Sequence, residues 1–193
     1  MIWAVIPAKP AAEGKSRLAG VLTLAQRIQL NLYLFRRTLG IVCAALPSER
    51  VLVVSRDPAL LGIAATAGAQ PLIERGGNLN QALHQAAAYP PLTGGLLAIS
   101  TDLPELTPED LQALLAEPGA VTIAPDRLGK GTNALLTTPA ACIPYCFGEN
   151  SFSLHSAAAA QRGLIPRIIS RPGLAADLDT PEDLHGHPGL IPG

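Results

Sequence analysis

Lysine is scarce in this sequence. Three of its 193 residues are lysines, against eleven arginines, and the charged fraction is 15% with a formal net charge of −1. A chain so balanced has no overall basic field, which excludes nucleic acid as an expected partner. Basic residues therefore matter where they cluster, and two of the lysines, Lys9 and Lys15, stand six residues apart in one segment.

Long hydrophobic runs are also missing, although 48% of the residues are apolar. A membrane-spanning helix needs roughly 18–20 continuous apolar residues. The longest candidate, residues 30–46, is interrupted by Arg36 and Arg37. Met1 leads directly into a strand-like run without a basic leader, so we expect neither a signal peptide nor a membrane partner. The high apolar content instead indicates a sheet that is buried on both faces.

Cysteine is rare, with three in the whole chain. Cys142 and Cys146 are spaced C-x3-C without a second pair or a nearby histidine, which argues against a zinc site. Cys43 lies in an apolar helical run and is expected in the core. This usage favours a reduced, cytoplasmic protein.

Strand-like and helical segments alternate along the chain. Strands are predicted at 2–6, 50–55, 69–73, 95–100, 120–124, 133–137 and 165–170. Helices are predicted over 23–46 and 151–162, and after residues 57, 77, 107 and 180. The alternation favours an α/β three-layer sandwich with a mostly parallel sheet, and the break in it over 133–161 suits an antiparallel strand. We expect one domain over 1–193, with a flexible Gly/Pro-rich tail at about 187–193.

The loop after the first strand, "PAKPAAEGKSR", concentrates positive charge in Lys9, Lys15 and Arg17. A Walker A phosphate loop is excluded, because that motif needs glycine where Lys9 stands, and no G-x-G-x-x-G occurs. Three cations so close together repel one another unless an anion or solvent screens them. A polyphosphate suits this mixture of lysine and arginine, and the alternative is a solvated surface loop.

Carboxylates follow two later segments. Asp102 comes just after the fourth predicted strand, at the sheet edge where ligands bind in such folds. Its natural role is to bind Mg²⁺, and the alternative is a cap for the following turn. Asp177 and Asp179 alternate along an extended segment and are expected to face the same way, as a second source of metal ligands. Asp183 fits better as the partner of Thr180 in a helix cap.

A second set of small polar residues lies in the last third of the chain. Thr132 and Asn133 follow a glycine-flanked Lys130, and Gly148 and Glu149 lead to Ser151 at a predicted helix start. Exposed N–H groups at a helix start form an anion site. The chain thus offers two anion sites with a possible metal between them, which suits an enzyme with two phosphorylated substrates. His84 and His155 are expected to be structural.

The order of several motifs resembles one known family. The stretches "KSRL", "DLPELTPED", "APDR", "GTNAL", "FGENSF" and "DLDTPEDL" span nearly the whole chain, and together they resemble the 2-phospho-L-lactate guanylyltransferases. The resemblance implies a nucleotidyltransferase-type Rossmann-like fold, of the nucleotide-diphospho-sugar transferase group. It also implies transfer of GMP from GTP to the phosphate of a three-carbon acid, with release of pyrophosphate, in 8-hydroxy-5-deazaflavin coenzyme biosynthesis.

The same resemblance assigns roles to residues. It implies Lys15, Arg17 and Asp102 as catalytic residues, and Mg²⁺ bound by Asp102 with Asp177 or Asp179. The residues implied for GTP are Ala8, Lys9, Lys15, Asn78 and Asn80. Those implied for the acid are Thr132, Asn133, Gly148, Glu149 and Ser151. Ser100 departs from the family, because some relatives carry an acidic residue there.

The sequence leaves three questions open. The acid is phosphoenolpyruvate, 3-phospho-D-glycerate or 2-phospho-L-lactate, and a bacterial composition leans toward the first two. Another nucleotide or acceptor, such as molybdopterin or a sugar phosphate, and a non-catalytic nucleotide-binding protein are the alternatives. A homodimer is the commonest assembly of soluble oligomers and serves as the expectation here.

Overall fold

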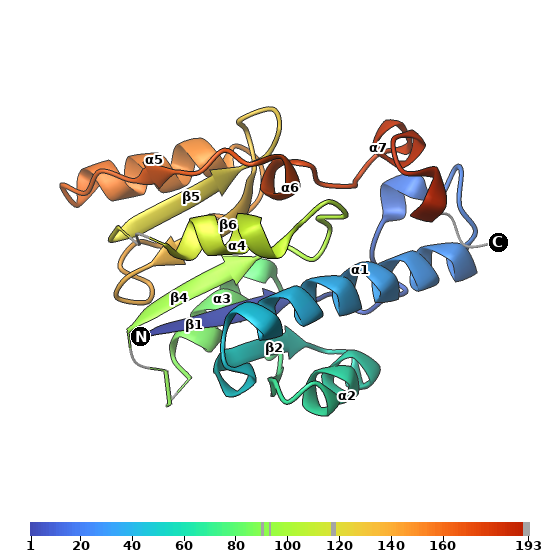
Figure 1. Ribbon diagram of the computed structural model, residues 1–193, viewed down its shortest axis with the longest axis horizontal. Helices are drawn as coiled ribbons and strands as arrows, with labels where there is room; N and C mark the ends of the chain where they lie inside the picture. Colours follow the sequence, from blue (N-terminus) through green and yellow to red (C-terminus); the bar gives the residue numbers. More distant parts are fainter. Residues whose placement is uncertain (90, 93, 117–118, 191–193) are drawn as a thin grey trace.

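The computed structural model describes residues 1–193 except 90, 93, 117–118 and 191–193 (Figure 1). Its described residues form a seven-stranded sheet in the order β3-β2-β1-β4-β6-β5-β7. The strands are β1 (Ile2–Pro7), β2 (Val51–Ser55), β3 (Gln70–Ile73), β4 (Gly95–Ile99), β5 (Val121–Pro125), β6 (Thr132–Thr137) and β7 (Arg167–Ile168). Since β1, β2 and β4 are central and rich in branched apolar residues, their middle residues are buried.

The sheet is mixed, as expected. Strand β1 pairs in parallel with β2 and β4, and β2 pairs in parallel with β3. Strand β6 runs antiparallel to both β4 and β5, and β5 pairs in parallel with β7. The antiparallel strand predicted within 133–161 is therefore β6. The carboxyl ends of β1 to β4 meet at one edge of the sheet, which is where the site forms.

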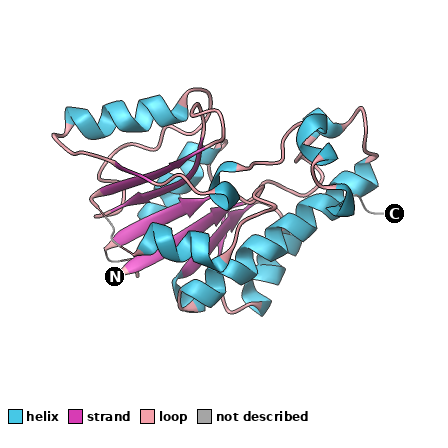
Figure 2. Ribbon diagram, turned by 45° about the horizontal axis from the view of Figure 1, so that its top comes forward, coloured by secondary structure: helices cyan, strands magenta, loops and turns pink. Residues whose placement is uncertain are grey.

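Helices cover both faces of the sheet and make three layers (Figure 2). The helices are α1 (Leu24–Ala45), α2 (Pro58–Thr66), α3 (Leu79–Ala87), α4 (Pro108–Leu115), α5 (Ser151–Gln161), α6 (Pro172–Ala175) and α7 (Pro181–His185). One apolar core holds side chains of α1, α2, α4 and α6, and the other holds side chains of α3 and α5. The predicted α/β sandwich is confirmed.

Helix starts follow the capping residues in the sequence. Thr23 and Thr180 each begin a helix with a capping box, and the Asp57 carboxylate accepts the Ala59 N–H ahead of α2. The strand predicted at 165–170 is wrong in length, since β7 has only two residues. The proline at position 172 instead begins the short helix α6, because its fixed φ suits a first helical turn.

A third apolar cluster attaches the C-terminal segment to the β1–α1 connection. It holds Leu18, Leu22, Leu30, Leu34, Leu178 and Leu184, with Leu190 against it. Of the expected tail, residues Pro188–Leu190 form a short 3₁₀ helix, and 191–193 lie outside the described residues. Among the helices described, none is long and apolar enough to cross a membrane. The consequence for the site is that residues near Leu178 lie beside residues near Leu18.

Candidate active site

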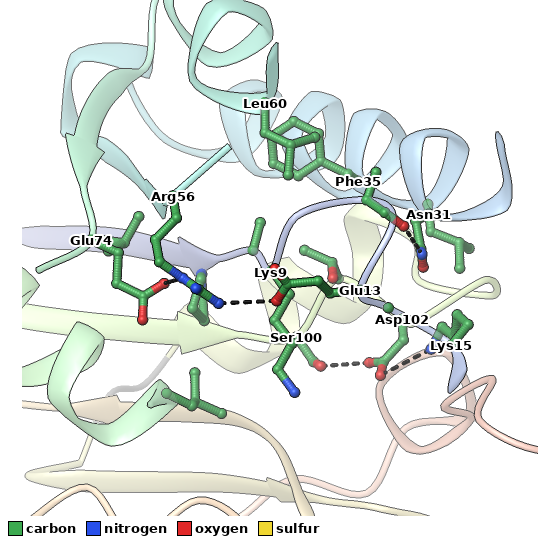
Figure 3. A pocket seen from close by; sticks show the side chains of 18 of the residues that line it. Lys9, Glu13, Lys15, Asn31, Phe35, Arg56, Leu60, Glu74, Ser100 and Asp102 are labelled. Carbon is green, nitrogen blue, oxygen red and sulfur yellow. Dashed lines mark hydrogen bonds and ion pairs between the residues drawn. The ribbon is translucent and has the colours of Figure 1, made fainter. Parts of the chain in front are cut away.

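A cavity of about 430 Å³ opens at the carboxyl edge of the parallel strands (Figure 3). Its wall comes from the segments that follow β1, β2, β3 and β4, with Phe35 of α1 and Leu60 of α2. The predicted site residues in this wall are Ala8, Lys9, Lys15, Arg17, Asn78, Asp102 and Asp179. Seven residues from four separate stretches of sequence therefore meet in one place.

Lys15 is the buried cation of the cavity wall. Its side chain is only 7% exposed, and its Nζ lies 3.2 Å from Asp102 Oδ2 and 3.0 Å from Asp179 Oδ1. Burial alone would lower the pKa of Lys15, but the two carboxylates outweigh it and the pKa is raised. The ammonium is therefore held charged between two carboxylates from distant parts of the chain.

Asp102 is held in its charged form by the same ion pair with Lys15. Burial would raise its pKa, but Lys15 and a hydrogen bond from the Ser100 hydroxyl outweigh burial, so the pKa is lowered. Ser100 thus serves as a hydrogen-bond donor to Asp102. Arg17 lies farther out, with Nη1 3.5 Å from Asp179 Oδ2 and its side chain 73% exposed.

The loop that carries Lys15 is held by polar contacts. The Asn31 side chain of α1 donates to the Ala11 carbonyl at 2.7 Å, and the Ala11 N–H donates to Asp57 Oδ2 at 3.2 Å. A Cβ on Gly14 would lie 2.6 Å from Asn31 Nδ2, so glycine lets the loop pass close to α1. Lys15 itself adopts a left-handed conformation, with φ of 56°, which non-glycine residues adopt at a cost. The surrounding contacts hold it there.

A second charged group lies at the other end of the cavity. Arg56, directly after β2, has its Nη2 3.0 Å from Glu13 Oε2 and its Nε 3.6 Å from Glu74 Oε2. Sequence reasoning missed these three residues. The available signal was position, because Arg56 and Glu74 each follow a strand at the same edge as Asp102.

The two predicted asparagines lie differently. Asn78 lines the cavity and caps α3, where its side chain accepts the Gln81 N–H. Asn80 is not part of the cavity wall, and its amide binds the backbone of Phe147 twice. It accepts the Phe147 N–H at 2.8 Å and donates to the Phe147 carbonyl at 3.0 Å. Asn80 thus positions Phe147, which does line the cavity.

The residues predicted for the acid lie beyond this wall. Thr132 and Ser151 are buried, Glu149 is exposed, and the Asn133 amide donates to the Leu174 carbonyl at 3.0 Å. Gly148 has φ of +129°, which favours glycine. The structure thus does not bring these residues into the cavity that holds Lys15 and Asp102.

His155 links several of these elements. Its Nε2 accepts the Cys146 N–H at 2.9 Å, so its Nδ1 carries the hydrogen and donates to Thr132 Oγ1 at 3.1 Å. Burial lowers the pKa of His155 to about 4. This neutral, fully bonded ring confirms a structural role and joins β6 to the loop that precedes α5.

The chain is similar to known proteins over nearly its whole length. The family model described as "Guanylyl transferase CofC like" matches residues 2–187. The chain belongs to this family. It is 43% identical over 188 residues to a phosphoenolpyruvate guanylyltransferase of Rubrobacter xylanophilus, covering 95% of this chain and 91% of that protein. It is 36% identical to a 3-phospho-D-glycerate guanylyltransferase of Colwellia psychrerythraea, covering 93% and 88%.

Solved structures of distant sequence share the fold of this chain. A putative nucleotide-diphospho-sugar transferase from Desulfovibrio desulfuricans superposes with a TM-score of 0.71 at 15% identity, covering 95% of this chain and 84% of that one. A nucleotidyl transferase from Methanothermobacter has the same TM-score at 16% identity, covering 99% and 98%. The fold is therefore the one that the sequence motifs indicated, and the relatives above give the transferase class.

Two of the three predicted metal ligands, Asp102 and Asp179, line the cavity. Asp102 and Asp179 already converge on one cation, the Lys15 ammonium. Asp177 is outside the cavity wall, and burial and the charges of Asp102 and Asp179 raise its pKa. Within the described residues, no three His, Cys, Asp or Glu side chains are grouped to hold a metal ion. Two carboxylates suffice for Mg²⁺ when phosphate oxygens and water complete the coordination.

Replacing Asn80 with alanine is expected to lower the free energy of unfolding by about 1–3 kcal/mol, because the N–H and carbonyl of Phe147 lose their partners. Urea denaturation measures the change. Asn80→Asp keeps the acceptor for the Phe147 N–H but sets a carboxylate oxygen against the Phe147 carbonyl, so it should also be less stable than the parent. A loss below about 0.5 kcal/mol in the alanine variant would contradict the positioning role.

Proposed function

We propose that the protein moves GMP from GTP onto the phosphate of phosphoenolpyruvate and releases pyrophosphate. The observation that carries this proposal is the buried Lys15 between Asp102 and Asp179, in a cavity at the carboxyl edge of the parallel strands. Relatives named phosphoenolpyruvate guanylyltransferase support the choice of acid. The product is then the guanylylated acid used in deazaflavin coenzyme biosynthesis.

The reaction needs little proton transfer. A phosphate monoester has a second pKa near 6 and is mostly dianionic at neutral pH. One of its oxygens attacks the α-phosphorus of GTP, a new P–O bond forms, and the bond from the α-phosphorus to the leaving pyrophosphate breaks. The buried His155 has both nitrogens bonded and a pKa of about 4, so it is no base for this step.

The chain's own residues provide position and charge. Lys15, with Lys9 and Arg17, neutralises the triphosphate, and Asp102 and Asp179 hold the metal. Bound Mg²⁺ would draw negative charge from the phosphate oxygens. Asn78 lines the nucleotide side, and Ala8 supplies a wall without a bulky side chain. In this proposal Asn80 acts on the nucleotide through Phe147.

The acid remains assigned to Thr132, Asn133, Gly148, Glu149 and Ser151. The support is the family resemblance, since the structure gives Thr132 and Asn133 buried partners of their own. The N–H groups of Ser151 and Phe152, at the start of α5, already donate to the carbonyls of Gly148 and Lys130. Binding of the acid there therefore needs either other N–H groups of this loop or a local rearrangement.

Pyrophosphate release from GTP and Mg²⁺ tests the proposal, with each of the three acids offered separately. We expect release with phosphoenolpyruvate and much less with 3-phospho-D-glycerate or 2-phospho-L-lactate. Because such acids differ by small groups, discrimination of about 10–200-fold is expected where apolar contacts read them. Binding of GTP without release under any acid would instead favour a nucleotide-binding protein without this activity.

A further inference from the structure

The cavity has two ends of opposite character, arranged along the sheet edge (Figure 3). The strand order β3-β2-β1-β4 places Glu74, Arg56, Lys9 and Asp102 after successive strands. Three strand spacings separate the first from the last, roughly 14 Å. An elongated ligand that lies along this edge meets Lys15 and Asp102 at one end, and Arg56 and Glu74 at the other.

The charges decide which end takes phosphate. Lys9, Lys15 and Arg17 all belong to the loop after β1, and these three cations outnumber the two carboxylates that pair with Lys15. That end therefore carries a net positive charge. At the other end the one guanidinium of Arg56 is shared between Glu13 and Glu74, so that group carries a net negative charge. A triphosphate is attracted to the first end and repelled by the second. The base of a bound nucleotide therefore lies at the Arg56 end.

We propose that Glu74 and Arg56 recognise guanine. The proposal rests on the proposed function, because it takes GTP as the substrate. The Glu74 carboxylate accepts hydrogen bonds from N1–H and the N2 amino group of guanine, and Arg56 donates to O6. The Glu74 side chain is only 11% exposed, and the Glu74 N–H donates to the Ser55 carbonyl at 2.9 Å, which fixes the residue after β3 against β2.

The donor and acceptor pattern excludes adenine. Adenine offers an amino donor where guanine has O6, and an acceptor where guanine has N1–H. The first faces a donor in Arg56 and the second faces a carboxylate in Glu74, so both contacts become repulsive. Inosine keeps O6 and N1–H but lacks the N2 amino group, and it should lose one of the two bonds to Glu74.

Titration calorimetry of the full chain with GTP, ITP and ATP tests this assignment. In the parent protein we expect GTP to bind more tightly than ITP, and ITP more tightly than ATP. Glu74→Gln should weaken GTP by about 10–100-fold, as expected for loss of a two-bond contact. It should also bring the GTP/ITP affinity ratio close to one. ATP should bind more tightly than to the parent, because the amide removes the repulsion of adenine N1 and offers it an N–H donor.

Glu13→Gln is the matched control, since Glu13 pairs with the same guanidinium from the loop after β1. It should keep the GTP/ITP ratio of the parent. Arg56→Lys is a second variant, which keeps the charge but loses the forked donor, and it should reduce the preference for GTP over ATP. If Glu74→Gln does not fold, Arg56→Lys still tests the assignment, because the Arg56 side chain is half exposed and its replacement leaves the core intact.

The outcomes separate the two proposals. If both Glu74→Gln and Arg56→Lys retain the parent's nucleotide preferences, the base-reading assignment is overturned and the guanylyltransferase proposal stands. If the parent binds GTP no better than ATP, the base-reading assignment also fails. If the parent binds no nucleotide, the proposed function itself fails.

Discussion

Lys15→Met is expected to lower kcat/KM about 10²–10³-fold, the usual cost of removing one preorganised charge contact from an active site. The methionine keeps most of the apolar stem but removes the ammonium between Asp102 and Asp179. Asp102 and Asp179 then lose the ammonium that they share, and the incoming triphosphate loses one of its positive partners. Steady-state pyrophosphate release measures the loss, and circular dichroism with thermal unfolding checks the fold.

Lys130→Met is the natural comparison. Lys130 is exposed and outside the cavity wall, so its loss should cost far less than the loss of Lys15. Turnover within about threefold of the parent in Lys15→Met would remove Lys15 from the mechanism, since a factor of three corresponds to less than 1 kcal/mol of transition-state stabilisation.

Acidification from pH 6.5 to 4 is expected to cost about 3 kcal/mol of stability through His155 alone. Burial lowers the folded-state pKa of this ring to about 4, whereas the unfolded chain keeps the ordinary value of 6.5. Between these values the unfolded state binds more protons. The contribution of the neutral His155 ring to the free energy of unfolding is therefore complete above pH 6.5, and it is lost as the pH falls toward 4.

Urea unfolding at several pH values measures how the free energy of unfolding changes with pH. The non-titrating variant His155→Gln should be less stable at pH 7 but should lose less on acidification than the parent. His185→Gln, at an exposed position, should follow the parent's slope. A parent whose unfolding free energy is level from pH 6.5 to 4.5 would show that His155 is not the buried neutral ring described above.

Most of the fold was predictable from local patterns. Thr23, Asp57 and Thr180 were predicted to cap helices, and each of the three helices begins at the residue after its cap. Such starts can be predicted because the capping side chain accepts an N–H from a residue at most three positions further along the chain. The run 51–55 could be predicted as a buried strand because its residues are mostly branched and apolar, and it forms β2. The last strand was overestimated, because residues 165–170 have little apolar pattern of their own and pair with a single strand, β5.

The site was predictable in part. Lys15 and Asp102 were found because each follows a strand whose carboxyl end must lie at one edge of a parallel sheet. Asn80 was assigned to the nucleotide, but its amide binds Phe147, 67 residues away. Arg56 and Glu74 were overlooked, since single charged residues after strands carry no motif.

The sequence by itself determined the helix and strand pattern, the charge of the first loop and membership in the family, because these depend on neighbours along the chain. Only the tertiary structure decided which charges meet. Lys15 and Asp179 are 164 residues apart, and they lie 3.0 Å from each other because Leu18 and Leu178 share one apolar cluster. Packing of distant apolar side chains set the partners of Lys15, and no local pattern records that choice.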